Sequence, residues 1–212
     1  MKTRFVAFSV FVLLLFAAVN TGFSQQVLLG PRISGNLNIF NQQAKSDFSF
    51  SGIGVGIGGT LDITFSKHIG LMVDLTAFDM RNISASNTAN NTTTDISLTL
   101  SYLTVDPMFE LNFSGFYMVA GPSLGVKLGS SATETQTPTN GNPTVTTYTI
   151  KTNSIVFDIA TGVGYTFKLS QGMFMGTDFM VYIPLSNTYD LPGNSNSVLT
   201  LKLGVSLKFN IM

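Results

Sequence analysis

The sequence predicts an all-β protein that crosses a membrane as an eight-stranded antiparallel up-and-down β-barrel. The last fourteen residues, 199–212, alternate between apolar and small or polar side chains at almost every position. Successive side chains of a strand point to opposite faces, so this segment has one apolar face and one polar face. Its length suits a tilted membrane-crossing strand, which needs about 9–11 residues. The same pattern recurs seven more times upstream.

Composition supports the same class. Only 10% of the residues are charged and the mean hydropathy is +0.33. Beyond the N-terminus no apolar run approaches the roughly 18 residues that a spanning helix requires, so the apolar residues are dispersed at period two. There is no cysteine, which excludes disulfides and thiolate chemistry. The charge balance gives no reason to expect nucleic-acid binding.

The N-terminus has the features of a secretory signal peptide. Lys2 and Arg4 form a basic region, residues 5–19 form an apolar region, and Gly22 and Ser24 are small residues before a cleavage site after Ser24. We therefore expect residues 1–24 to be a signal peptide and 25–212 to be the barrel domain. An uncleaved anchor is the alternative. Export followed by dispersed apolar strands predicts the bacterial outer membrane.

Turn signals divide the rest of the chain into eight strands. These are residues 27–39, 50–65, 69–83, 95–113, 116–128, 146–167, 172–185 and 199–212. The fourth strand changes phase, because its first apolar residues have even numbers and its later ones odd numbers. An extra residue near Tyr102 would restore a common outer face, so we expect a β-bulge there.

The connections alternate between short and long. Short turns lie at residues 66–68, 114–115 and 169–171, and long polar loops at 41–49, 84–94, 129–145 and 186–195. Bacterial barrels have tight periplasmic turns and longer outer loops, so both termini are expected to be periplasmic. Aromatic residues near the short turns are expected to ring one bilayer interface. They are Phe65, Phe113, Phe116, Tyr165, Phe167 and Phe209.

The distribution of charge gives the strongest physical argument. A lipid-facing Lys or Arg at mid-membrane costs roughly 2–4 kcal/mol, so ionised groups should face the lumen. Ten charged residues have inward parity: Arg32, Asp62, Asp74, Asp106, Glu110, Lys127, Asp158, Asp178, Lys202 and Lys208. An eight-stranded barrel is just wide enough for its interior to be filled by side chains. We expect a structural ion-pair network in a plugged lumen without an open pore.

Two segments resemble a known family. The run 101–107, Ser-Tyr-Leu-Thr-Val-Asp-Pro, and the run 121–125, Gly-Pro-Ser-Leu-Gly, resemble the "YLEIP … GPYLG" pattern of small Bacteroidota outer-membrane β-barrels, called PorT-like or OmpX-like. This resemblance implies an eight-stranded outer-membrane barrel, and most such proteins have no assigned activity. The sequence departs from the pattern at Asp106, where an apolar residue is usual, and at its non-aromatic end, Met212.

Candidate chemical sites have simpler explanations. Residues 54–59 fit G-x-G-x-x-G, but a dinucleotide site needs a helix to begin there and the sequence continues as a strand. His68 is the only histidine and lies in a predicted turn beside Lys67, without a carboxylate nearby. The inward carboxylates could bind a cation or act as paired acids, but inward basic residues are available as partners. We predict no catalytic residue, metal or cofactor.

The sequence therefore favours a non-enzymatic barrel with a structural or surface-interaction role through its long outer loops. The alternatives are a narrow channel or a barrel that binds or transports a small amphiphile, and a lipid-modifying enzyme. A soluble lipocalin-like barrel would need a polar outer face. Expected partners are outer-membrane lipid and the barrel-assembly machinery, with the chain a monomer, no nucleic acid bound, and no surface partner identified.

Overall fold

The computed structural model describes residues 26–42, 51–148, 152–188 and 196–211, and these fold almost entirely into strands. In chain order the strands are β1 (Gln26–Gln42), β2 (Ser51–Thr64), β3 (Ile69–Ala89), β4 (Thr92–Phe113), β5 (Phe116–Pro138), β6 (Thr144–Tyr148), β7 (Ile155–Ser170), β8 (Met173–Pro184) and β9 (Asn196–Asn210). No helix among the described residues is long and apolar enough to span a bilayer.

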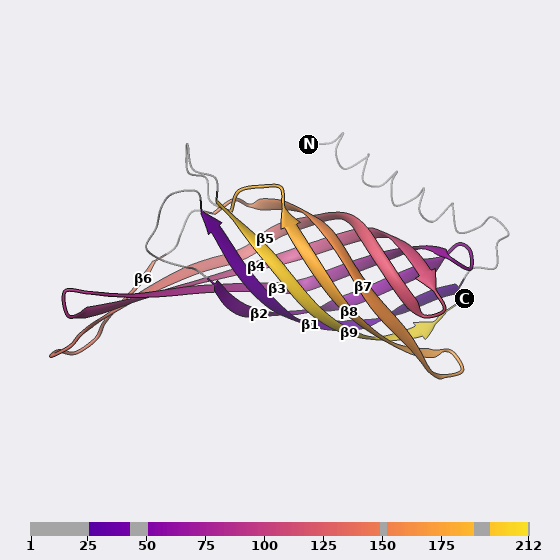
Figure 1. Cartoon of the computed structure of the whole chain (residues 1–212), viewed down its shortest axis with the longest axis horizontal. Coiled ribbons are helices and arrows are strands. Elements are labelled where there is room, and N and C mark those ends of the chain that lie inside the picture. Colours follow the sequence, from indigo (N-terminus) through magenta and orange to yellow (C-terminus); the bar gives the residue numbers. More distant parts are fainter. Residues whose placement is uncertain (1–25, 43–50, 149–151, 189–195, 212) are drawn as a thin grey trace.

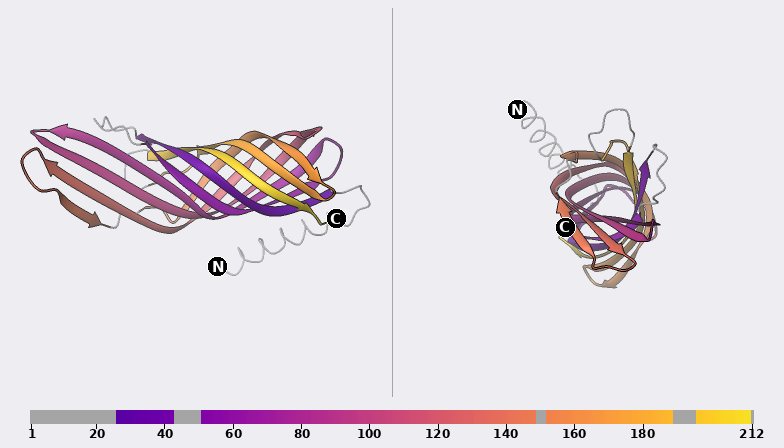
Figure 2. Two further views of the ribbon diagram at one scale, coloured as in Figure 1. Left: turned by 90° about the horizontal axis from the view of Figure 1, so that it is seen from below. Right: turned by 90° about the vertical axis from the view of Figure 1, so that its left-hand side faces the viewer.

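Eight of these strands close into a ring. The order is β4-β3-β2-β1-β9-β8-β7-β5, all neighbours are antiparallel, and β4 also pairs with β5. The end view in Figure 2 shows the closed wall. The prediction of an eight-stranded antiparallel barrel is confirmed.

The two ends of the barrel differ in their connections. Tight turns join β2 to β3, β4 to β5 and β7 to β8 at the end where β9 finishes, which we call the turn end. The tightest turn needs positive φ at two successive residues, Ser114 at 57° and Gly115 at 98°, which matches the strand twist of a two-residue hairpin. We call the opposite end the loop end.

A four-stranded sheet extends past the rest of the barrel at the loop end (Figure 1). The predicted loops 84–94 and 129–145 are largely strand in the structure, because β3 and β5 continue to Ala89 and Pro138. The hairpin between β3 and β4 turns at Asn90 and Asn91, both with positive φ. We call residues 85–89, 92–96, 132–138 and 144–148 the protruding sheet.

The sixth predicted strand, 146–167, is two separate strands. Its first part is β6, which pairs with the outer half of β5 in the protruding sheet. The remainder is β7, which pairs with the inner half of β5 in the barrel wall. The two strands are thus consecutive neighbours along the same edge of β5.

The outer face of the wall is apolar and the inner face carries the charges. Large hydrophobic side chains are exposed on every barrel strand, for example Ile33 at 60%, Ile53 at 74% and Leu203 at 66%. Buried ionised groups occupy the interior instead. This polarity is that of a membrane barrel and the reverse of a soluble one.

The expected bulge at Tyr102 was placed on the wrong strand. The register between β4 and β5 does shift between Ser101 and Tyr102, but the extra residue is Leu128 of β5. The inward face of β4 alternates without a break, so Leu98 and Leu100 are buried inside the barrel. The apolar residues move from even to odd numbers along β4 because the lumen is apolar at Leu98 and Leu100. The strand itself keeps its even-numbered residues on the inner face throughout.

Candidate functional site

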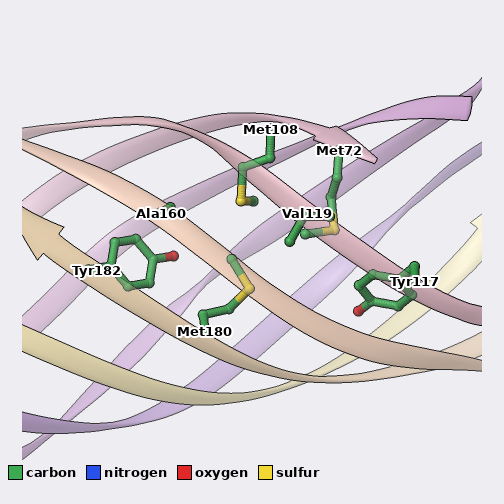
Figure 3. Packing of buried hydrophobic residues seen from close by; sticks show 7 residues of the cluster. All are labelled: Met72, Met108, Tyr117, Val119, Ala160, Met180 and Tyr182. Atoms are coloured by element: carbon green, nitrogen blue, oxygen red, sulfur yellow. The ribbon is translucent and has the colours of Figure 1, made fainter. Parts of the chain in front are cut away.

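The lumen is the site that the sequence singled out, and the structure fills it with side chains. Near the turn end the buried apolar and aromatic residues form one cluster (Figure 3). Its members are Met72, Met108, Tyr117, Val119, Ala160, Met180 and Tyr182. Nearer the loop end lies a second cluster, with Phe40 packed against it. Its members are Ile83, Leu98, Leu100, Tyr102, Ala132, Val156 and Val198.

The first ion-pair group is centred on Arg32. Its Nε lies 3.2 Å from Oδ2 of Asp74, and its Nη2 donates to Oδ1 of Asp178. These contacts join β1 to β3 and to β8 across the interior. All three residues are at least nine-tenths buried.

The second group is centred on Asp79. Its Oδ1 lies 3.0 Å from Nζ of Lys202 and its Oδ2 lies 3.0 Å from Nε of Arg81. Arg81 also donates through Nη2 to Oδ2 of Asp158 at 3.1 Å. Asn36 donates to the same Asp79 carboxylate at 2.8 Å. The group links β1, β3, β7 and β9.

A third ion pair lies toward the turn end, where Lys208 donates to Oδ2 of Asp62. Glu110 is nearby and accepts from Nδ2 of Asn112 at 3.0 Å. Both carboxylates line a cavity of about 460 Å³ at the turn end, with Tyr165 and Phe167 on its other side.

Tyrosine rings lie against three of the four buried cations. Arg81 is 5.1 Å from the centre of the Tyr102 ring, Lys202 is 4.3 Å from that of Tyr182, and Lys208 is 5.3 Å from that of Tyr117. Such contacts favour a cation that has lost its water. Nothing in the sequence indicates this role, because a tyrosine of inward parity looks like any other lumen side chain.

Three of the ten predicted residues take part in no ion pair among the described residues: Asp106, Lys127, and Glu110, which accepts from Asn112. Asp106 has no basic group within ion-pair distance among the described residues, and it accepts from Oγ of Ser123 at 2.6 Å and the Tyr182 hydroxyl at 2.9 Å. Lys127 is half-buried and donates to the carbonyl and hydroxyl oxygens of Thr152. The other predicted residues take part in the contacts described above.

Strict alternation missed Asp79 and Arg81. Their odd numbers place them on the lipid side, but β3 holds an extra residue between Thr76 and Asp79 relative to both of its neighbours. The bulge reverses the parity and turns both charges inward. The available signal was the adjacent apolar pair Ala77 and Phe78, both of which face outward.

The described residues contain no group of three or more metal-ligating side chains. His68 is exposed at the turn end, with Nδ1 2.9 Å from the carbonyl oxygen of Asn112 and its ring 5.8 Å from that of Phe113. These contacts hold it on a turn outside the lumen. The glycines of residues 54–58 lie in β2, where Met80 O and Leu75 O approach them closely.

Several solved structures resemble this chain at low sequence identity. Solved structures that resemble this chain include Ail of Yersinia pestis, at 14% identity over 87% of this chain and 99% of that chain, with a TM-score of 0.40. OprG of Pseudomonas aeruginosa is 10% identical over 89% and 97%, with a TM-score of 0.43. Neisserial surface protein A is 11% identical over 86% and 97%, with a TM-score of 0.38.

No curated protein matches the sequence. The family model described as "Outer membrane protein beta-barrel domain" matches residues 2–190. This match spans most of the chain and agrees with the apolar outer wall and charged interior. The chain therefore belongs to the outer membrane protein beta-barrel domain family and is a bacterial outer-membrane protein.

Proposed function

We propose that this protein is a non-enzymatic, monomeric outer-membrane barrel that acts through its protruding sheet, with the lumen as a packed structural core. The turn end faces the periplasm and the loop end faces the outside in this proposal. The alternation of tight turns and long outer connections supports that orientation.

The observation that carries the proposal is the pair of open edges on the protruding sheet. Among the described residues the last pairing between β2 and β3 is Ser51 with Ser84, and β3 beyond it pairs with β4 alone. On the other side β6 is the last strand of the sheet. An open edge offers unpaired backbone groups to an extended segment of another chain.

The side chains of the β6 edge leave it open to such pairing. Edge strands are commonly protected by charged residues or proline. The described side chains of β6, Thr144, Val145, Thr146 and Thr147, are exposed and carry neither.

Charge indicates what kind of segment fits. The described part of the protruding sheet holds two acidic residues, Asp95 and Glu134, and no basic residue. Asp95 lines a groove of about 440 Å³ with Ser, Thr and Ala side chains of β3, β4 and β5. A basic, extended peptide segment is complementary to this surface.

The test uses the purified barrel in lipid nanodiscs and a short labelled peptide of alternating threonine and lysine. We expect saturable binding by fluorescence anisotropy, and no binding of the matching threonine–glutamate peptide. A variant whose residues 86–95 are replaced by Asn-Gly keeps the paired residues Ala85 and Ile96 at a two-residue turn. It should bind more weakly, because it lacks the β3 edge and Asp95 but keeps β6 and Glu134. Equal binding of both peptides, or full binding by the shortened variant, would contradict the proposal.

Orientation is tested in intact cells, since the chain has no native cysteine. We expect a membrane-impermeant maleimide to label the variant Val145→Cys and to leave Lys67→Cys unlabelled until the outer membrane is permeabilised. Labelling of Lys67→Cys alone in intact cells would reverse the orientation.

A further inference from the structure

Two prolines interrupt the wall between β4 and β5. Pairing across this seam stops after Val105 of β4 and resumes at Phe109. The register on both sides of the interruption is the same, so Pro107 of β4 stands opposite Pro122 of β5. Both residues have their side chains on the outer face of the barrel.

The missing proline N–H groups interrupt only the pairing between β4 and β5. On the other edge of β4, Pro107 pairs with Val73 of β3 without interruption. On the other edge of β5, Pro122 pairs with Ile159 of β7 without interruption. In an antiparallel ladder a residue directs its N–H and C=O to the same neighbour. Proline has no N–H, so the seam loses both bonds of one pair.

The result is a pair of carbonyl oxygens without a backbone donor between them. Water is absent from the hydrocarbon region and cannot satisfy them there. Gly121 adjoins the gap, and a Cβ at this position would lie only 2.1 Å from the Pro107 oxygen. The absence of a side chain at Gly121 therefore lets the Pro107 oxygen lie close to the β5 backbone.

The wall outside the gap is hollowed and apolar. A groove of about 370 Å³ follows the seam toward the turn end, lined by Phe109 and Leu111 of β4, Met118 and Ala120 of β5, and residues of β7 and β8 that include Phe179. An alkyl chain matches its lining. The groove thus begins at Phe109 and Ala120, the first backbone pair on the turn-end side of the gap.

The lumen side of the gap presents a third acceptor. Asp106 directly precedes Pro107, and its carboxylate receives hydrogen bonds from Ser123 across the seam and from Tyr182. Tyr182 points its hydroxyl into the interior in Figure 3. A buried carboxylate without a cation partner favours a donor and repels an anionic headgroup.

We infer that the Pro107–Pro122 gap is a lateral binding site for a membrane-dissolved amphiphile that carries a hydrogen-bond donor, of the alcohol or amine class. The donor occupies the place of the missing N–H groups and bonds to the two proline carbonyls. The apolar part lies in the groove beside Phe109. This site is in the barrel wall and is independent of the function proposed for the protruding sheet.

The experiment uses a reporter that the chain lacks. There is no tryptophan in the sequence, so Phe109→Trp places a single fluorophore in the groove, and Ile33→Trp places one on the lipid-facing side of β1 as a control. Each full-length variant in nanodiscs is titrated with bromohexanol that carries its bromine at the end remote from the hydroxyl. We expect saturable quenching of the Phe109→Trp reporter and non-saturating quenching of the Ile33→Trp reporter.

The donor and the gap are then tested separately. Blocking the hydroxyl as its methyl ether should weaken binding about tenfold, because one hydrogen bond is lost. Pro107→Val with Pro122→Val restores both N–H groups and should weaken it at least as much. Pro31→Val is the matched control: Pro31 interrupts β1–β9 opposite Leu207, which keeps its own N–H, and binding at the reporter should be unchanged.

Three outcomes would overturn the inference. They are non-saturating quenching of the Phe109→Trp reporter, equal affinity for the alcohol and its ether, and unchanged affinity in the folded double variant. If the double variant does not fold, the single variants Pro107→Val and Pro122→Val and the ether comparison decide the question. Folding is checked by the shift in gel mobility on heating.

Discussion

Arg32 shows how single side chains hold the barrel closed from within. Its guanidinium contacts Asp74 on β3 and Asp178 on β8, so one residue of β1 bridges three strands. Because all three groups are buried, loss of the cation leaves the negative charges of two carboxylates without a positive partner in a region of low dielectric constant. Removing one partner of a buried ion pair typically costs about 3–5 kcal/mol.

We therefore predict that Arg32→Met lowers the free energy of unfolding by about 3–5 kcal/mol. Urea titration of the protein in detergent, followed by the mobility shift of the folded barrel on gels, measures this change. Lys127→Met is the control, because the Lys127 ammonium binds only Thr152 oxygens at a half-buried position, and it should cost about 1 kcal/mol. Equal losses in the two variants would show that Arg32 has no special structural role.

The sequence predicts ten inward charges from parity and from the cost of a lipid-facing charge, and nine of these ten residues are buried in the structure. It could not locate Asp79 and Arg81, since a single extra residue in β3 reverses the parity beyond it. Nor could it indicate partners. The contact of Arg81 with Asp158 joins residues 77 positions apart, and such a pairing depends on strand tilt and on which rotamers fit.

At the scale of the element, β3 and β5 each accommodate one extra residue beside β4. In β3 the extra residue is one of the outward-facing pair Ala77 and Phe78. In β5 the extra residue is Leu128. A bulge increases the local twist and bends the strand. The bulge of β5 lies where the wall passes into the protruding sheet. The bulge of β3 lies within the wall and keeps Asp79 and Arg81 facing the lumen.

Deletions test this interpretation of the bulge. Removing Phe78 eliminates the extra residue and leaves Asp79 and Arg81 in their inward phase, so this variant should fold. Removing Val105 from the regular part of β4 turns every inward residue on one side of the deletion toward lipid. On the turn-end side this brings the carboxylates of Asp106 and Glu110 to the lipid face, where an ionised group is costly.

We predict that the Phe78 deletion yields heat-modifiable, folded barrel in the outer membrane and that the Val105 deletion does not. The amount of each variant in isolated outer membranes and its gel mobility with and without heating give the answer. If both deletions fold equally well, register is not set by the charges of the lumen.

The protruding sheet is the element that the sequence does not predict. Residues 84–94 and 129–145, rich in threonine and asparagine, have no period-two apolar pattern, and only Ala85 and Ala132 among their described apolar side chains are buried. The structure pairs them nonetheless, from Ala85 with Ile96 to Ala89 with Thr92. Threonine favours strands by its branched side chain, and two asparagines with positive φ close the hairpin.

At the scale of the whole molecule, the interior is layered along the barrel. The inward side chains of β4 run from Leu98 and Leu100 through Asp106 to Met108 and Glu110, from the loop end to the turn end. Asp106 is thus enclosed between apolar layers, whereas Glu110 lies beyond Met108 at the turn end. Such layers exclude water, so an ion entering the lumen would have to lose its hydration shell without gaining new ligands.

The layered interior also has an excess of negative charge. Among the described residues it buries seven carboxylates and four cationic groups. The carboxylates are Asp62, Asp74, Asp79, Asp106, Glu110, Asp158 and Asp178, and the cations are Arg32, Arg81, Lys202 and Lys208. Any pathway opened through this interior should therefore favour cations over anions.

We predict that the purified protein in a planar lipid bilayer gives no steady single-channel current. A triple variant, Met108→Ala with Met180→Ala and Tyr182→Ala, removes three fully buried side chains from the cluster near the turn end. This variant should conduct ions with cation selectivity, which is measured as a reversal potential in a salt gradient. The comparison is informative in both directions, because a silent native protein beside a conducting variant places the barrier in these side chains. Steady current from the native protein would instead mean that the layers part in a fluid bilayer, and the barrel would then be a narrow channel.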